Sequence, residues 1–206
     1  MEDSLAITML KEGDLAGLEV LVDRYYLHAV RSACLIVQDL PLAEDIVQEA
    51  FIRASGKISQ LRSNQFVPWF MKSVINASLR EVKKQQRHTS LPDQDDEVTY
   101  TLSKWLIDQS PIPEIAVETV EFRNSIWQAL NLLSPEQRAA IIMKYYLEMS
   151  EKEIITVLKL PLSTIKKRLF SARQNLKRIL SKNQPSIITN PMHIISKHNR
   201  KEQKNE

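Results

Sequence analysis

The sequence predicts an all-α protein made of two helical domains joined by an acidic linker. Only 3 of its 206 residues are glycine and 43% are hydrophobic, which is typical of helices with short connections. No long stretch alternates with period two, as a half-exposed strand would. The charge is also divided, because residues 1–87 have no net charge, residues 88–120 carry −6 and residues 121–180 carry +6. Such a division predicts two modules with different partners.

The first domain is expected at residues 1–87 and contains four helices. Their expected positions are about residues 4–12, 14–37, 42–55 and 67–87. Gly13 ends the first helix and Asp14 caps the second, because glycine and aspartate are favoured at those positions. Pro41 interrupts the chain before the third helix, whereas Pro68 fits the first turn of the fourth. A loop separates the third helix from the fourth.

The second domain is expected at residues 114–181, after an acidic linker at residues 88–113. Prolines and clustered carboxylates mark the linker: Pro92, Asp93, Asp95, Asp96, Glu97, Pro111 and Pro113. Two helices are expected at about residues 114–133 and 134–147, the second opened by Ser134 as its cap. Residues 182–206 are a polar, basic tail that we expect to be disordered.

The stretch SEKEIITVLKLPLSTIKKRLFSARQNLKRIL, residues 150–180, is the most informative part of the chain. Ser150 and Glu153 have the spacing of a capping box that opens a short helix. Pro161 ends that helix, and Ser163 is expected to cap a second one. One side of the second helix is apolar: Ile165, Leu169, Ala172, Leu176 and Ile179. Its other side is basic and free of acidic residues, which predicts a helix-turn-helix that binds DNA. A helical hairpin with a merely solvated basic side is the alternative.

The side chains expected to contact DNA lie on the first turns and the cationic side of that second helix. They are Ser163, Thr164, Lys166, Lys167, Arg168, Ser171 and Arg173. Ser163 and Thr164 are also expected to present backbone N–H groups to a phosphate.

The third expected helix of the first domain has two different faces. Its core stripe is Ile46, Val47, Ala50, Phe51 and Ala54, and its second face is Asp45, Gln48, Glu49 and Ile52. Hydrogen-bonding groups around one apolar residue suit docking on another protein. A solvated surface with one stray isoleucine explains the same pattern.

The fourth expected helix begins with aromatic residues and ends with basic ones. Phe66, Trp69 and Phe70 each suit the core, but aromatic rings beside a basic helix also suit single-stranded DNA. The polar stripe that follows them is Asn76, Arg80, Lys83, Lys84 and Arg87. Asn can bond to base edges, while Arg and Lys neutralise phosphates. Taken alone, the stripe is equally explained as an exposed, solvated face.

Nothing in the sequence indicates catalysis or a metal site. The four histidines are scattered, and there is no phosphate loop. The single Cys34 excludes an internal disulfide and is expected to be a small buried hydrophobe. No run approaches the ~18 to 20 apolar residues of a membrane span, and Glu2 and Asp3 stand where an export signal would carry cations. We expect a cytoplasmic, non-enzymatic protein without cofactor, small-molecule substrate or integral membrane segment.

Three motifs in order resemble the extracytoplasmic-function group of bacterial RNA polymerase sigma factors. LVDRYYLHAVRSACLIV followed by LAEDIVQEAFIRA resembles the opening of the family's sigma-2 domain, and FVPWFMKSVINASLREVKK is similar to its F-x-x-W segment. Residues 129–180, including TIKKR and SAR-x-x-L, resemble its sigma-4 domain nearly end to end. The resemblance covers roughly residues 14–87 and 114–180.

The resemblance implies a promoter-selecting protein that binds the β′ clamp and β flap of core RNA polymerase. Docking on the clamp would involve Asp45, Gln48, Glu49 and Ile52. Melting and reading of the −10 element would involve Arg62, Ser63, Asn64, Trp69, Asn76, Arg80, Lys83 and Lys84. The helix at residues 163–173 would read the −35 element as duplex, and the acidic linker would thread toward the RNA exit path. A regulatory anti-sigma factor is the expected further partner.

Four residues depart from the family's pattern. Arg80 stands where aspartate is frequent, which puts its role in the −10 contact in question. Met149, Lys159 and Ser163 stand where glycine is common, so Lys159 is expected to adopt a left-handed conformation. Two other functions are considered: a stand-alone dimeric helix-turn-helix regulator leaves the face with Asp45 unexplained, and a helical adaptor protein leaves the cationic helix unexplained.

Overall fold

The computed structural model describes residues 2–62, 65–88 and 125–183 of the chain. Every regular element within these ranges is a helix, so the expected all-α class is confirmed. The chain divides into two compact units, one up to Lys83 and one from Lys84 onward. Residues 89–124 and 184–206, which hold most of the expected linker and tail, lie outside the described ranges.

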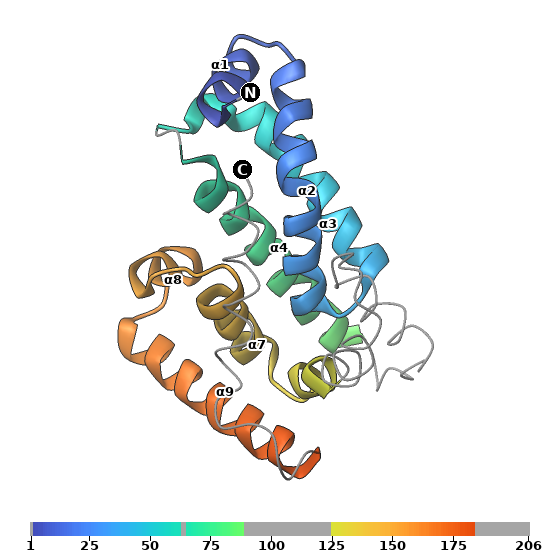
Figure 1. Ribbon diagram of the computed structural model, residues 1–206, viewed down its shortest axis with the longest axis vertical. Helices are drawn as coiled ribbons and strands as arrows, with labels where there is room; N and C mark the ends of the chain where they lie inside the picture. Colours follow the sequence, from blue (N-terminus) through green and yellow to red (C-terminus); the bar gives the residue numbers. More distant parts are fainter. Residues whose placement is uncertain (1, 63–64, 89–124, 184–206) are drawn as a thin grey trace, which may run out of the picture. The chain divides into compact units, whose positions relative to one another are not determined.

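The first unit is built from four α-helices and one short 3-10 helix, and the last α-helix continues for five residues past Lys83. They are α1 (Asp3–Lys11), α2 (Ala16–Val37), α3 (Leu40–Lys57), η1 (Ile58–Gln60) and α4 (Phe66–His88). Figure 1 shows α2 and α3 side by side and α1 against the beginning of α2. All four expected helices are present, and their ends differ from expectation by only a few residues.

The start of α3 corrects one expectation. The helix begins at Leu40, so Pro41 lies in its first turn and does not interrupt the chain before it. The cause is a cap, because the Leu42 N–H donates to the Asp39 carboxylate at 2.9 Å. At the preceding helix, Asp14 accepts from the Ala16 N–H at 2.9 Å, but the capping position itself is Leu15. Gln38 ends α2 in the left-handed conformation, with φ 63°.

Helix α1 packs directly on the backbone of α2. A Cβ atom on Gly17 would lie 2.2 Å from the carbonyl oxygen of Ala6, so only glycine allows this close approach. Ile7 and Leu10 of α1 are buried. The Asp3 carboxylate accepts hydrogen bonds from Arg24 and from the Tyr25 hydroxyl. These contacts fix both ends of α1 on α2.

Aromatic rings join α4 to the other helices of the first unit. The Phe70 ring lies 4.3 Å from the Phe51 ring of α3, measured between centroids, and stacks at 5.2 Å on Phe66. The Phe66 ring also lies 5.8 Å from the Tyr25 ring of α2. Phe66 and Phe70 are each 1% exposed, so both belong to the core, as expected. The core stripe expected on α3 is also buried.

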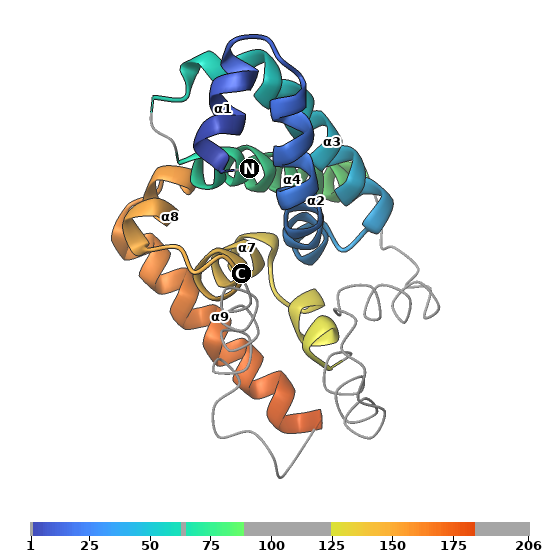
Figure 2. The same cartoon turned by 45° about the horizontal axis from the view of Figure 1, so that its top comes forward.

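Beyond the end of α4, the described part of the second unit consists of helical residues 125–131, three further α-helical segments and a π turn. They are α7 (Pro135–Ile141), the π turn η2 (Ile142–Tyr146), α8 (Glu151–Leu158) and α9 (Leu162–Asn183). Figure 2 shows α9 running past α7, with α8 near its N-terminal end. Capping boxes open α7 through Ser134 and Gln137 and α8 through Ser150 and Glu153, and both caps were expected.

The π turn η2 replaces the end of the helix expected up to Leu147. The Leu147 N–H donates to the Ile142 carbonyl at 2.9 Å, five residues back, where an α-helix would bond four residues back. The Met149 N–H reaches the Met143 carbonyl at 2.9 Å. Glu148 between them has φ 52°. The chain therefore leaves η2 through a left-handed residue that is not glycine.

The core of the second unit is almost wholly aliphatic. The whole apolar stripe expected on α9 is buried, and Met143, Ile154 and Trp127 are buried with it. Arg138 of α7 is an exception, because it is only 7% exposed and its Nε has no hydrogen-bond partner among the described residues. Burial lowers the pKa of Arg138 to about 10, so the side chain still carries its charge at neutral pH.

Candidate nucleic-acid and protein interfaces

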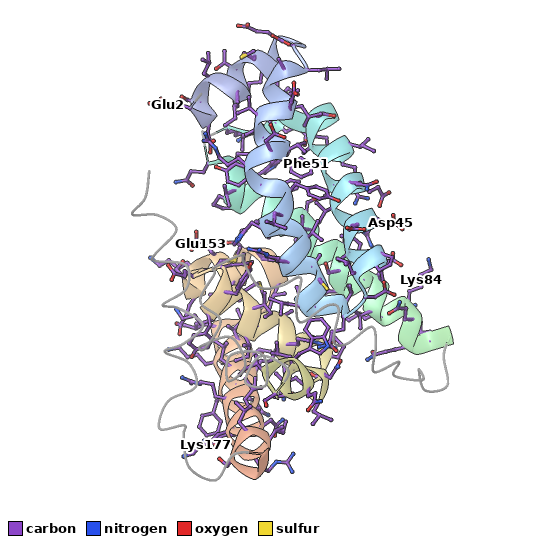
Figure 3. All side chains as sticks on the ribbon, turned by 45° about the vertical axis from the view of Figure 1, so that its right-hand side comes forward. Glu2, Asp45, Phe51, Lys84, Glu153 and Lys177 are labelled. Carbon is purple, nitrogen blue, oxygen red and sulfur yellow. The ribbon has the colours of Figure 1, made fainter. Side chains whose placement is uncertain are left out.

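The polar face of α3 surrounds a groove. Asp45, Gln48, Glu49 and Ile52 all line it, so the structure brings the four residues of the predicted docking face together. Its other lining residues are Leu42, Ile46 and Glu81, the last from α4, and its volume is about 330 Å³. In Figure 3, Asp45 points away from the core that Phe51 enters.

The groove combines an acidic rim with an apolar centre. Asp45 and Glu49 are exposed, and Ile52 is 70% exposed although its side chain is fully aliphatic. Glu49 pairs with Arg53 one turn further along the helix, with 3.3 Å between the charged atoms. A surface of this kind suits a partner that presents basic side chains around an apolar one.

The basic stripe of α4 is solvent-accessible along its length. Its members are Asn76, Arg80, Lys83, Lys84 and Arg87, and all of them are exposed. Figure 3 shows Lys84 on the last turns of the helix. Arg80 follows Asn76 by four residues and Lys83 follows Arg80 by three, so these side chains share one helix face. The face can neutralise phosphates along a strand.

The aromatic residues at the start of α4 differ in burial. Phe66 and Phe70 are buried, whereas Trp69 is only partly buried and lies 6.0 Å from the Phe66 ring. The core interpretation therefore fits the two phenylalanines, and Trp69 keeps part of its ring available for stacking. Arg62, on the other side of the connection, is exposed. Ser63 and Asn64 lie outside the described residues.

Helix α9 presents the expected cationic side. Lys166, Lys167 and Arg173 are exposed, whereas Thr164, Arg168 and Ser171 are half-buried. Lys166 lies 3.8 Å from the Glu151 carboxylate of α8, an exposed ion pair between the two helices of the motif. Figure 3 shows Lys177 further along the same helix.

The start of α9 corrects two expectations. The helix begins at Leu162, so Ser163 lies inside its first turn and does not cap it. The Thr164 and Ile165 N–H groups both donate to the Pro161 carbonyl, at 3.0 and 3.2 Å. The Thr164 N–H is therefore used within the protein and is not offered to a phosphate. The expectation for Lys159 is confirmed, because its φ is 53°.

The exposure of Phe170 on α9 was not predicted. Phe170 is 57% exposed and follows the buried Leu169, so it lies off the apolar stripe and near the cationic side. The spacing of the stripe could have revealed this exposure. Phe170 comes one residue after Leu169 and two before Ala172, and it is not three or four residues from any member of the stripe. Its ring can contact a thymine methyl group or another apolar surface.

Within residues 2–62, 65–88 and 125–183, no group of three or more His, Cys, Asp and Glu side chains could hold a metal ion. No helix in the described part of the chain has the length and apolar character needed to cross a membrane. Cys34 is buried, as expected, and burial raises the pKa of its thiol to about 12.

Both units match known protein families. The family described as Sigma-70 region 2 matches residues 21–88, and Sigma-70, region 4 matches residues 123–176. The chain is 30% identical over 179 residues to the ECF RNA polymerase sigma factor SigW of Bacillus subtilis, covering 84% of this chain and 94% of that protein. It is 27% identical over 178 residues to the ECF RNA polymerase sigma-E factor of Escherichia coli, with coverages of 84% and 92%.

Two solved structures share the fold. One is CnrH in complex with the cytosolic domain of CnrY, with a TM-score of 0.59 and 17% identity, covering 88% of this chain and 99% of that one. The other is the sigma factor RpoE in complex with the anti-sigma factor NepR from Bartonella quintana, with a TM-score of 0.56 and 20% identity, covering 81% and 99%.

Proposed function

The chain belongs to the extracytoplasmic-function group of the sigma-70 family, and we propose that the faces described above divide the steps of initiation among them. It binds core RNA polymerase and directs promoter-specific transcription initiation, with the −10 element read by the N-terminal domain and the −35 element by the helix-turn-helix. The observation that carries this function is the order of region 2 and region 4 on one chain. A stand-alone repressor has no use for region 2.

Core binding is assigned to the groove on α3. Asp45, Gln48, Glu49 and Ile52 surround it and would contact the β′ clamp, with the carboxylates meeting basic side chains and Ile52 meeting an apolar one. Burial of Ile52 alone would favour the complex by about 1.5 to 3 kcal/mol. The acidic rim would also repel DNA from this face, which keeps it free for the protein partner.

Recognition of the −10 element is assigned to the connection before α4 and to the exposed stripe of α4. Arg62, Ser63, Asn64 and Trp69 would hold an unstacked base, at an unstacking cost of a few kcal/mol. Asn76, Arg80, Lys83 and Lys84 would follow the strand's phosphates and base edges. The exposure of the described members supports this assignment. Because Arg80 is a cation in place of the family's frequent aspartate, we assign it to a phosphate.

Recognition of the −35 element is assigned to the first turns of α9. Ser163, Thr164, Lys166, Lys167, Arg168, Ser171 and Arg173 would contact base edges and phosphates of the duplex. Lys166 must leave its ion pair with Glu151 to reach DNA, but such an exposed pair is worth at most about 1 kcal/mol. The β flap would be contacted by this same unit.

The division of the chain follows from these assignments. We place the sigma-2 domain at residues 1–87, the acidic linker at 88–113, the sigma-4 domain at 114–181 and a basic tail at 182–206. The chain would act in the cytoplasm, where the polymerase is, and would have no catalytic step of its own. An anti-sigma factor is proposed as its regulator, since the two solved structures described above are complexes and NepR is named as an anti-sigma factor.

In vitro transcription on genomic fragments tests the function. Core polymerase supplemented with this chain should make transcripts with defined start sites, and footprints of that holoenzyme should reveal protected −10 and −35 elements. A protein that only suppresses transcripts made by another sigma factor would instead be the stand-alone regulator. Failure to associate with core polymerase would overturn the proposal.

A further inference from the structure

Helix α1 precedes the residues matched by region 2, which begin at 21, and none of the assignments above gives it a role. We propose that α1 is a positioning element for −10 recognition, because one end bonds directly to Leu61 and the other reaches Phe66 through Tyr25, and these two residues bound the connection between η1 and α4. This inference rests on the proposed function, since Arg62 and Trp69 at that connection are assigned there to the −10 strand.

The first anchor is a hydrogen bond from the end of α1. The Lys11 Nζ donates to the carbonyl oxygen of Leu61 at 3.0 Å, across 50 residues of sequence. The Leu61 N–H donates to the Ile58 carbonyl at 3.0 Å, and the Leu61 side chain is buried. Both backbone groups of Leu61 are thus engaged, which fixes the direction in which the chain leaves toward Arg62.

The second anchor starts from the beginning of α1. The Asp3 carboxylate accepts from the Tyr25 hydroxyl, and the Tyr25 ring contacts the buried Phe66 ring. Burial, and then the bond to Asp3, raise the pKa of Tyr25 to about 12, so the hydroxyl keeps its proton and remains a donor at neutral pH. Phe66 in turn contacts Trp69. The position of Trp69 is therefore coupled to α1 through two rings.

Both anchors start from α1, which is itself fixed on α2. Gly17 lets α1 lie against the backbone of α2, and the Asp3 carboxylate also bonds to Arg24. The distance between Leu61 and Phe66 is consequently set by a helix that is itself fixed. A site that receives an unstacked base gains from such preorganisation, because no ordering of the protein has to accompany base capture.

The test uses the full chain in holoenzyme and the promoter found by the transcription assay. Opening of a duplex template, and capture of the strand on a template with an unpaired −10 region, are followed by the fluorescence of 2-aminopurine placed in the −10 element. Lys11→Met should slow opening of the duplex about tenfold, the effect of losing one charge-assisted hydrogen bond. Lys11→Met should also weaken capture of the −10 strand on the unpaired template, because the unstacked base enters the same preorganised site. Lys11→Arg should restore wild-type behaviour on both templates.

Asp3→Asn examines the second anchor, with Glu19→Gln on α2 as the matched control for removal of one carboxylate charge. Asp3→Asn should slow duplex opening and weaken capture on the unpaired template, whereas the control should change neither. Normal duplex opening by both α1 variants, or an equal loss caused by Glu19→Gln, would overturn this inference alone. Absence of opening by the wild-type holoenzyme would instead overturn the proposed function.

Discussion

The two units bury different kinds of side chain and expose different kinds of charge. The first unit packs Phe51, Phe66 and Phe70 in its core and presents an acidic groove as well as a basic stripe. The second unit packs mainly aliphatic side chains and presents a cationic side on α9. This difference matches the two tasks, because capturing an unstacked base requires rings held in place, whereas reading a duplex requires a cationic helix of the correct width.

The largest effect is expected from reversing the charge of the docking groove. Asp45→Arg combined with Glu49→Arg should weaken core polymerase binding by at least about 100-fold, since two attractive contacts become repulsive. Titration of labelled core polymerase measures this. Glu19→Arg with Asp23→Arg is the matched control, because it makes the same charge change at the same spacing on the exposed side of α2. Equal loss in both double variants would mean that the groove has no special role.

A smaller effect is expected at the duplex-reading face. Lys167→Glu should reduce affinity of the holoenzyme for the −35 element about 10- to 100-fold, in line with about 1–3 kcal/mol for a lost groove contact. Arg178→Glu, an identical change of net charge near the other end of α9, should cost much less. Competition binding with promoters that keep or lack the −35 element provides the measurement. Equal losses on both promoters would contradict a local contact.

Relief of backbone strain at the end of α8 should modestly raise the free energy of unfolding of the second unit. Lys159 ends α8 with φ 53°, a conformation that costs a residue with a Cβ about 1–2 kcal/mol. Lys159→Gly should therefore raise the free energy of unfolding by about 1 kcal/mol. Lys152→Gly, within α8, is the contrasting variant and should lower it by a similar amount. Thermal unfolding of both variants would show opposite shifts in Tm; a loss in both would contradict the strain.

The smallest effect concerns pH and separates two similar caps. Glu153 accepts from the Ser150 N–H at 2.8 Å and from its hydroxyl at 2.7 Å, and these bonds lower the pKa of Glu153 below its usual 4.5. A lowered pKa stabilises the fold above pH 4.5, and this contribution disappears as pH falls through the folded-state value.

The uncharged box at α7 provides the control for that prediction. Glu153→Ala should cost about 0.5 kcal/mol at pH 7 and progressively less in acid. Gln137→Ala should cost a similar amount at every pH, because an amide does not titrate there. Unfolding curves between pH 7 and 3 would reveal the divergence. A Glu153→Ala cost that does not change with pH would contradict the assigned role of the charge.

Local chemistry explains which parts of this fold could be predicted from sequence. The cap at Ser150, the stripe on α9 and the left-handed Lys159 depend on residues within a turn of each other, and all three are present. Pro41 was ambiguous because proline interrupts a helix or opens one, and the cap by Asp39 decides between these outcomes. The π turn leaves no mark in apolar spacing, so its position could not be predicted.

The candidate sites were also predictable only where residues close together in the sequence define them. The members of the α3 face were predictable from periodicity, but the groove also needs Glu81, which comes from α4. Exposure of Trp69 beside two buried phenylalanines depends on how α4 meets α2 and α3. The contact between Lys11 and Leu61 joins distant parts of the sequence and leaves no local pattern. Pairwise spacing cannot reveal contacts that only the tertiary packing creates.

The π turn at Ile142–Tyr146 has a consequence for building chimeric proteins. Each residue added to or removed from a helix rotates everything that follows by about 100°. Deleting one residue of this turn to restore α-helical pitch would thus swing α8 and α9 away from α7, although the composition would hardly change. Chimeras that exchange promoter specificity between homologues should therefore join the two sequences upstream of Pro135. The π turn then stays with α8 and α9, whose orientation it determines.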